Sequence, residues 1–424
     1  MENFSASLLE AVTCPACGLL CDDIRIERDS AGQLKMRDKG CAKSVTFFER
    51  TRQTSSPSIN GKPATLNEAI KTAADILRNA NQPLFAGLGT EVHGMRSVLS
   101  LADKVGASLD HMNAYSSFRN TLVIQNSGWQ VTTLTEVRNR VDLLLIIGTD
   151  IVSHNPRFFE RNIWNEESMF DQDTNSREIV YLGGQSLETA AGISPKGKKP
   201  TVLPCDPARL AEVVAALRAI IFGKNLQETE ISGIKTSDLQ SLAERLKAAK
   251  YSVVTWIASD LNFKHAELTI QNIAELVIKL NEKTRSSGLP LGGSDGDYSV
   301  NQVSTWTSGY PIRNRFTRHY PEYDPYHFST ESLLSNSEAD ALLWVSEFNP
   351  DKNPPKTNIP TIVIGHGNMS ANNTAVFIPI STAGIDHIGT MFRIDSSVSL
   401  PLGKLRNSNL PSLTDVINEI EAAL

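Results

Sequence analysis

Residues 14–21 read Cys-Pro-Ala-Cys-Gly-Leu-Leu-Cys, and a fourth cysteine follows at position 41. Two short segments, 22–27 and 33–36, lie between them on either side of a glycine-containing turn, which predicts a β-hairpin. A hairpin of this size would bring the fourth cysteine back beside the first three. Thiolates gathered at one point suit a zinc ion or a four-iron cluster, because soft sulfur ligands favour those metals. The predicted metal ligands are Cys14, Cys17, Cys21 and Cys41.

Buried thiols without a metal, or disulfides, are the alternative interpretations of this quartet. No secretory signal precedes Cys14, so we expect a cytoplasmic protein whose thiols stay reduced, which argues against disulfides. The spacing favours a metal site over buried thiols. It leaves the choice between a four-iron cluster and zinc open.

The composition is that of an ordinary globular protein. The chain has 424 residues, of which 40% are hydrophobic and 21% charged, enough for two or three domains. Its net charge of −6 argues against nucleic acid or an anionic membrane as a principal partner. No apolar run approaches the length of about 20 residues that crosses a bilayer.

Beyond the cysteine module, the pattern predicts an α/β protein with two or more Rossmann-like domains built on parallel sheets. Buried strands are expected at 83–87, 141–147, 179–182, 201–203, 251–257, 341–345 and 362–364. Helices are expected at 65–77, 95–105, 208–222, 264–281 and 413–424. The polar segment 51–63 is expected to be a linker. We therefore divide the chain into a cysteine-rich module (1–55), two α/β domains (56–230 and 231–380) and a carboxyl-terminal segment (381–424).

Two strand ends carry candidate ligand-binding residues, because open α/β sheets bind ligands at the carboxyl ends of their strands. A glycine-rich turn follows the strand at 83–87 and leads into a helix, where backbone N–H groups can hold a phosphate. The strand at 141–147 delivers a second polar group, although its arginine is as readily explained by a surface ion pair. The candidates for cofactor binding are Gly87, Gly89, Gly148, Asp150, Asn155 and Arg157.

With these motifs in place, the chain resembles the B subunit of formylmethanofuran dehydrogenase, a member of the molybdopterin-dependent oxidoreductase superfamily. The resemblance runs nearly end to end. It is carried by the decapeptide at 14–23, by Asn-Gln-Val-Ser-Thr-Trp-Thr-Ser-Gly-Tyr-Pro at 301–311, by 384–395, and by His-Asn-Pro-Arg at 154–157. It implies the molybdopterin oxidoreductase fold, with the cysteine quartet holding a four-iron cluster that passes electrons to tungsten or molybdenum on two pterins.

The resemblance also places a residue at the position of the tungsten or molybdenum ligand, which is cysteine or selenocysteine in active members. The family's downstream Gln-x-x-Gly is present here at 125–128, and counting back from it puts Ser116 at the ligand position. A serine hydroxyl is a poorer ligand than a thiolate for this soft-donor arrangement. The loop Ser-Asp-Gly-Asp at 294–297 adds negative charge that would repel an anionic pterin. We therefore expect molybdopterin or tungstopterin to be absent and no catalytic residue in this chain.

This pattern looks most like the B subunit of the bacterial formyltransferase/hydrolase complex of methylotrophs. The resemblance implies a place in one-carbon metabolism, where the complex converts formyl-tetrahydromethanopterin to formate through formyl-methanofuran. Its partners would be the A, C and D subunits, with this chain as a structural subunit that carries out no redox step. Two alternatives stay open: an active tungsten or molybdenum formylmethanofuran dehydrogenase subunit, and an independent pterin- or nucleotide-binding module.

Overall fold

A computed structural model describes the chain except for residues 1–6, 52–54, 171, 184–186, 318–319 and 370–373. The polypeptide folds into two compact units. Unit 1 is made of residues 1–114, 293–393 and 398–424, and unit 2 is made of 115–292 and 394–397. This division differs from the contiguous domains expected from the sequence, because the sheet of unit 1 pairs strands that come from opposite ends of the chain.

The amino-terminal part of unit 1 is the predicted cysteine module. The hairpin expected between Cys21 and Cys41 is present as two antiparallel strands, and a third strand completes a small sheet in the order β1-β2-β3. A short helix follows directly from Cys41, which is its N-cap residue. The elements are β1 (Ser7–Val12), β2 (Ile24–Arg28), β3 (Leu34–Asp38) and α1 (Ala42–Phe48).

The main sheet of unit 1 has the order β16-β15-β7-β6-β17-β18-β19-β4-β5. The five strands from β7 to β19 run parallel, and the short outer strands pair antiparallel. Its strands are β4 (Ser58–Ile59), β5 (Lys62–Pro63), β6 (Pro83–Gly89), β7 (Ser108–Leu109), β15 (Asn314–Arg315), β16 (Glu322–Tyr323), β17 (Ala341–Ser346), β18 (Thr361–His366) and β19 (Val376–Ile380). In its described part, the expected linker at 51–63 therefore contributes a hairpin, β4 and β5, to the sheet edge.

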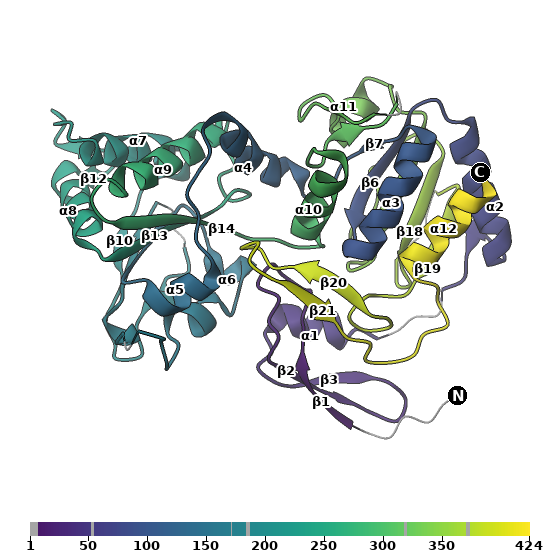
Figure 1. Cartoon of the computed structure of the whole chain (residues 1–424), viewed down its shortest axis with the longest axis horizontal. Coiled ribbons are helices and arrows are strands. Elements are labelled where there is room, and N and C mark those ends of the chain that lie inside the picture. Colours follow the sequence, from purple (N-terminus) through teal and green to yellow (C-terminus); the bar gives the residue numbers. More distant parts are fainter. Residues whose placement is uncertain (1–6, 52–54, 171, 184–186, 318–319, 370–373) are drawn as a thin grey trace. The chain divides into compact units, whose positions relative to one another are not determined.

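Helices cover both faces of this sheet. Alternate residues of β6 point to opposite faces: Phe85 packs with the helices α2, α3 and α12, and Leu84 packs on the other face with Leu333 of α11. In Figure 1, α2, α3 and α12 lie side by side on one face of the sheet. The remaining elements of unit 1 are α2 (Leu66–Asn79), α3 (Val92–Val105), α10 (Asp297–Ser308), α11 (Thr330–Ser335), β20 (Gly389–Phe392), β21 (Ser399–Leu402) and α12 (Leu413–Ala423). The helix expected at 65–77 is α2, and a capping box of Thr65 and Glu68 opens it.

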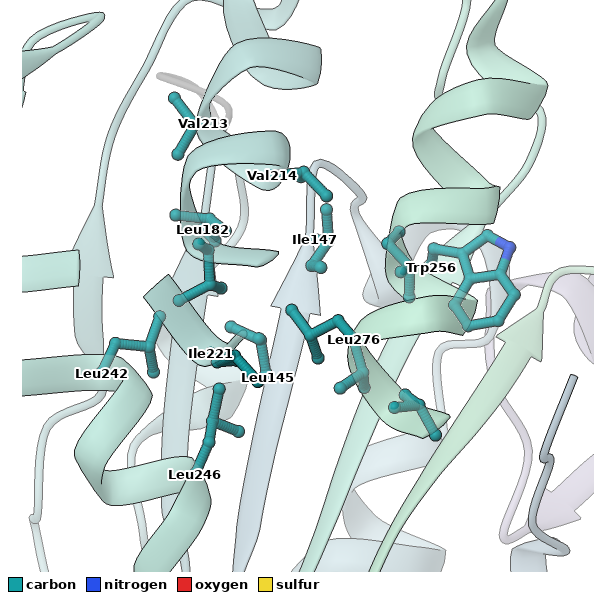
Figure 2. Close-up of a cluster of buried hydrophobic side chains, with 14 of the residues drawn as sticks. Leu145, Ile147, Leu182, Val213, Val214, Ile221, Leu242, Leu246, Trp256 and Leu276 are labelled. Carbon is teal, nitrogen blue, oxygen red and sulfur yellow. The ribbon is translucent and has the colours of Figure 1, made fainter. Parts of the chain in front are cut away.

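Unit 2 is built on a parallel sheet in the order β10-β9-β8-β13-β14. Its strands are β8 (Leu143–Ile147), β9 (Glu178–Leu182), β10 (Thr201–Leu203), β13 (Tyr251–Ile257) and β14 (Arg285–Leu291), with a small hairpin of β11 (Glu230–Ile231) and β12 (Ile234–Lys235). Its helices are α4 (Ala114–Ser127), α5 (Leu134–Arg140), α6 (Ile151–His154), α7 (Leu210–Ile221), α8 (Thr236–Ala248) and α9 (Ala266–Leu280). Figure 2 shows the core between the sheet and three of these helices, where Leu145 and Ile147 of β8 meet Val214 of α7 and Leu276 of α9.

The predicted fold class is thereby confirmed: both units are α/β and both are organised by parallel strands. Within the described residues, no helix is long and apolar enough to cross a membrane.

Candidate functional site

Cys14, Cys17 and Cys21 lie in the loop between β1 and β2, which is closed by a tight backbone turn, and Cys41 follows β3. The N–H of Cys14 donates to the carbonyl of Cys21 (2.8 Å), and the N–H of Leu20 donates to the carbonyl of Cys17 (3.2 Å). Leu20 adopts the left-handed conformation (φ 44°) that lets the chain fold back between these cysteines. Cys14, Cys17 and Cys21 are buried, and Cys41 is half-buried at the start of α1.

The other three cysteines act electrostatically on the thiol of Cys14. The pKa of Cys14 is raised well above its ordinary value by burial, and the neighbouring Cys17, Cys21 and Cys41 raise it further. Such a group of thiolates becomes stable when a cation offsets the repulsion, which is the chemistry of a thiolate-bound metal. In chemical type, four cysteine thiolates suit zinc or a four-iron cluster, and the bound metal stays a prediction. Among the described residues, no set of three or more His, Cys, Asp or Glu side chains is already arranged to hold a metal.

A second group of chemically unusual side chains lies at the carboxyl end of the unit 1 sheet, centred on Glu347 just after β17. Its carboxyl group is 1% exposed. It accepts hydrogen bonds from the hydroxyl of Thr90 (2.7 Å) and the N–H of Ala383 (2.7 Å), and the Nε2 of His387 lies 3.4 Å away. Burial raises the pKa of Glu347 to about 8, and the carboxylate of Glu91 contributes to the increase. Glu347 is therefore mostly protonated at pH 7.

The two other acids of this group have partners that hold them in place. The carboxylate of Glu91 accepts from the N–H of Gly94 (2.7 Å) and the N–H of Thr390 (2.9 Å). Asp386 accepts from the Nε of Arg406 (2.8 Å) and the N–H of Thr382 (3.1 Å). These bonds join the ends of β6, β17 and β19 to the carboxyl-terminal segment. The arrangement is a buried hydrogen-bond network.

The candidate glycines at the end of β6 have a clear structural role. Residues 87 and 88 form a bulge opposite Val345 of β17, and both have positive φ. A Cβ atom at Gly87 would lie 2.6 Å from the carbonyl oxygen of Val345, and one at Gly89 would lie 2.9 Å from the side chain of Met112. At the start of α3, the carboxylate of Glu91 accepts a hydrogen bond from the N–H of Gly94. This amide is one that a phosphate at the helix N-terminus would use. The glycines are explained by the close packing of β6 against its neighbours.

The candidates that follow β8 lie in unit 2. A Cβ atom at Gly148 would overlap the side chain of Leu210, so this position needs glycine for packing. Asp150 caps α6 by accepting from the amides of residues 152 and 153. Asn155 makes two hydrogen bonds of 3.0 Å with the backbone of Gly292 at the end of β14. The buried guanidinium of Arg157 pairs with Glu160. The structure brings these residues together on unit 2, while Gly87 and Gly89 belong to unit 1.

Sequence reasoning missed Asp260, a carboxylate of unit 2 with three polar partners. It follows β13 and lies beside the end of β8. It accepts from the hydroxyl of Thr149 (2.5 Å) and the N–H of Asp150 (3.1 Å), and the Nε2 of His154 lies 2.8 Å away. Burial alone would raise its pKa, but the hydrogen bonds from His154 and Thr149 bring the pKa of Asp260 below its ordinary value. The only sequence signal was its place after a buried strand, which also applied to Glu347.

Ser116 lies half-buried in the first turn of α4. Its neighbours in that turn include the exposed Tyr115, whose ring is tilted by 52° against that of Phe118, with 5.7 Å between the ring centroids. The Tyr115 ring also lies under the guanidinium of Arg119. The side chain of Arg119 is buried and donates to the carbonyl oxygens of Ala258 (2.7 Å) and Leu261 (2.8 Å). The helix that carries Ser116 is therefore fixed to the end of β13.

No protein-family model matches the chain. The B subunit of the tungsten-containing formylmethanofuran dehydrogenase 2 of Methanocaldococcus jannaschii is 28% identical over 402 residues, covering 91% of each chain. Its counterpart in Methanococcus maripaludis is 26% identical over 95% of each chain. The B subunit of the formyltransferase/hydrolase complex Fhc of Methylorubrum extorquens is 28% identical over 77% of this chain and 84% of the relative.

Two solved structures share the fold. The crystal structure of the formyltransferase/hydrolase complex from Methylorubrum extorquens with methylofuran contains a chain that superposes with a TM-score of 0.73 at 24% identity. That match covers 87% of this chain and 98% of the other. Acetylene hydratase from Pelobacter acetylenicus superposes with a TM-score of 0.64 at 11% identity, over 98% of this chain and 69% of the hydratase. The first of these neighbours is part of an assembly of several subunits.

Proposed function

This chain is a homologue of the B subunits of formylmethanofuran dehydrogenase and of the Fhc complex, and we propose that it is the B-type structural subunit of a formyltransferase/hydrolase complex. In this role it binds the A, C and D subunits and carries out no redox step. The conversion of formyl-tetrahydromethanopterin to formate through formyl-methanofuran takes place on those partners. The chain works in one-carbon metabolism in the cytoplasm.

The observation that carries this proposal is the serine at the family's metal-ligand position. The chain has five cysteines, and none lies between Cys41 and Cys205. A hydroxyl remains protonated at neutral pH unless a metal displaces its proton, so Ser116 is a weak ligand for a tungsten or molybdenum ion. The half-buried position of Ser116 on α4 is as compatible with a structural residue as with a metal ligand. Asp295, just before α10, adds negative charge that disfavours an anionic pterin. Burial raises the pKa of Asp297, the first residue of α10, to about 7, so this second carboxyl adds less charge.

In a subunit without redox chemistry, the cysteine quartet would have a structural role. Cys14, Cys17, Cys21 and Cys41 would hold zinc or a four-iron cluster, and the bound metal would offset the repulsion among the thiolates. Metal affinity becomes folding free energy in a module as small as this one. The module in turn holds the carboxyl-terminal segment: Arg28 of β2 donates to the carbonyl of Leu405 (2.7 Å). We propose that the bound metal stabilises the cysteine module and, through it, the packing of the carboxyl-terminal segment.

A second candidate function is an active tungsten or molybdenum dehydrogenase subunit. The observation that favours it is the 28% identity to a tungsten-containing dehydrogenase subunit over 91% of the chain. Serine at position 116 would then have to ligate the metal as an alkoxide. The two candidates differ in one measurable property, the presence of tungsten or molybdenum.

The test is elemental analysis of the complete complex, purified without oxygen from its native source. Iron, zinc, tungsten and molybdenum are measured per copy of this chain, and the same preparation is assayed for formyl transfer, formate release and viologen-linked formate oxidation. We expect iron or zinc without tungsten or molybdenum, and formate release without viologen reduction.

Two variants sharpen the result. Ser116→Ala should leave the subunit composition and formate release of the complex unchanged, because the proposal gives the hydroxyl no ligand role. Thr121→Ala, a substitution of another half-buried hydroxyl on α4, serves as the matched control. Near-stoichiometric tungsten or molybdenum that is lost in Ser116→Ala but kept in Thr121→Ala would overturn the proposal in favour of the dehydrogenase.

A further inference from the structure

Exposed tryptophan and tyrosine side chains are concentrated in one part of unit 1. Trp306, Tyr310, Tyr320 and Tyr326 are 52%, 39%, 50% and 62% exposed, and together they are called the aromatic surface. Among the described residues, the one other exposed side chain of these two types is Tyr115 in unit 2. Aromatic rings contribute most when they are buried, so a group of exposed rings marks a surface that contacts another molecule.

Two of these rings are held in place by aromatic neighbours. The ring of Trp306 on α10 meets the ring of Phe392 on the neighbouring strand β20 edge to face, with 5.5 Å between the centroids (Figure 1). The ring of Tyr310 lies parallel to that of Tyr323 on β16, with 5.6 Å between the centroids. The carbonyl of Tyr310 accepts from the hydroxyl of Ser304 (2.9 Å), which fixes it against α10. Side chains held this way lose little conformational entropy when a partner binds.

The aromatic surface includes one edge of the main sheet of unit 1. β16 is the last strand in the described order of that sheet, and Tyr320 and Tyr326 lie three residues before and after Tyr323. A charged pair between β15 and β16, Arg315 and Glu322 at 3.0 Å, carries no net charge. Natural proteins usually cover the edges of their sheets, and the cores of protein interfaces contain few unpaired charges. Both features fit a protein partner.

The size of the aromatic surface also indicates a protein partner. The exposed parts of its four side chains together equal about two whole aromatic side chains, or roughly 300–500 Å². In a stable protein interface each partner contributes about 800 Å². These four rings would therefore supply about half of one side of such an interface.

We propose that the aromatic surface binds one of the other subunits of the formyltransferase/hydrolase complex, with Trp306 and Tyr326 as its anchors. The inference rests on the proposed function, because it takes the partner from that complex. The partner presents an apolar surface with few charges, since it covers aromatic rings and a neutral ion pair. Trp306 and Tyr326 are the most exposed of the four rings, and their residue types are those that most often carry the binding energy of protein interfaces.

The experiment uses the whole complex, purified from its native source through an affinity tag on this chain. Trp306→Ala and Tyr326→Ala each remove one anchor. Tyr115→Ala is the matched control, because Tyr115 is 59% exposed, close to the 62% of Tyr326, but lies in unit 2. Mass spectrometry identifies the subunits that co-purify. Mass photometry over a dilution series gives the affinity of this chain for the rest of the complex and also detects pairs of this chain.

We expect Trp306→Ala and Tyr326→Ala to weaken binding to the rest of the complex by roughly tenfold or more, while Tyr115→Ala keeps the affinity of the wild type. The result for Tyr326→Ala decides, because the most exposed of the four rings contributes least to folding.

Equal affinities in Tyr326→Ala and Tyr115→Ala would overturn the inference and leave the proposed function standing. Pairs of this chain that dissociate in Tyr326→Ala would also overturn it, because the partner would then be a second copy. A wild-type chain that co-purifies with no formyltransferase or hydrolase subunit would contradict the proposed function itself.

Discussion

Replacing Glu347 by glutamine should make the protein more stable at alkaline pH and leave it no more stable at acidic pH. The carboxyl group is 1% exposed and lies near Glu91 and Asp386, which oppose its ionisation. Glutamine has the same shape. Its carbonyl can keep the hydrogen bond from the N–H of Ala383, and its amide can donate to the hydroxyl of Thr90, so the network survives without an ionisable group.

The magnitude follows from the pKa of this carboxyl. Its ordinary value is 4.5 and burial raises it to about 8 in the folded protein. Between these values the unfolded chain has lost the proton while the folded protein still binds it, so stability falls as pH rises through this window and levels off above pH 8. At about 1.4 kcal/mol for each pH unit, the full loss is roughly 3–5 kcal/mol. Glu347→Gln avoids this loss.

The assay is differential scanning calorimetry of the wild type and Glu347→Gln from pH 5 to pH 9. A domain of 150–250 residues changes its midpoint by about 2–4 °C per kcal/mol, so the variant should exceed the wild type by several degrees at pH 9. Glu10→Gln is the control, since Glu10 is 61% exposed and forms a surface pair with Arg25. A difference between Glu347→Gln and wild type that does not change with pH would refute the reasoning.

Two further changes test the quartet and the bulge of β6. Cys17→Ser should abolish stoichiometric iron or zinc in the purified protein, whereas Cys205→Ala in the unit 2 core should retain it; elemental analysis of both decides, and equal metal content would contradict the ligand assignment. Gly87→Ala and Gly128→Ala both place a side chain at positive φ (+76° and +66°), but only the Cβ at Gly87 meets a neighbour, the Val345 oxygen at 2.6 Å. Urea unfolding should show a loss of roughly 1 kcal/mol for Gly128→Ala and at least about 2 kcal/mol more for Gly87→Ala, and similar losses would show that the bulge is not tightly packed.

Local features of the fold could be predicted from the sequence because they depend on neighbouring residues. The hairpin inside the cysteine module, the capping box at Thr65 and the apolar strand β13 are all set by patterns a few residues long. β14 was missed because its sequence, Arg-Ser-Ser-Gly-Leu-Pro-Leu, contains a glycine and a proline that usually interrupt strands. It is held by a full parallel register with β13, which the sequence does not reveal.

The division into units and the acid network could not be predicted, because both depend on contacts between distant segments. β6 pairs with β17, so Pro83 lies opposite Ala341. Glu91, Glu347 and Asp386 come from three separate stretches of the sequence. Taken alone, none of them can be told from an acid on the protein surface. The roles of the four cysteines and of Ser116, which rest on spacing and on the family resemblance, stay predictions. The network could not be assembled from the sequence, because no pattern links its three separate stretches.

The discontinuity of unit 1 has a consequence for synthesis on the ribosome. Nearly all of unit 2 is one stretch, residues 115–292, whereas unit 1 needs residues 293–393 and 398–424 to complete it. We expect unit 2 to fold as soon as it emerges, while β6 still lacks its partner β17 and α2 and α3 still lack α12. Unit 1 would thus be the last part of the nascent chain to mature. Its exposed strand edge is where a chaperone would be needed during translation.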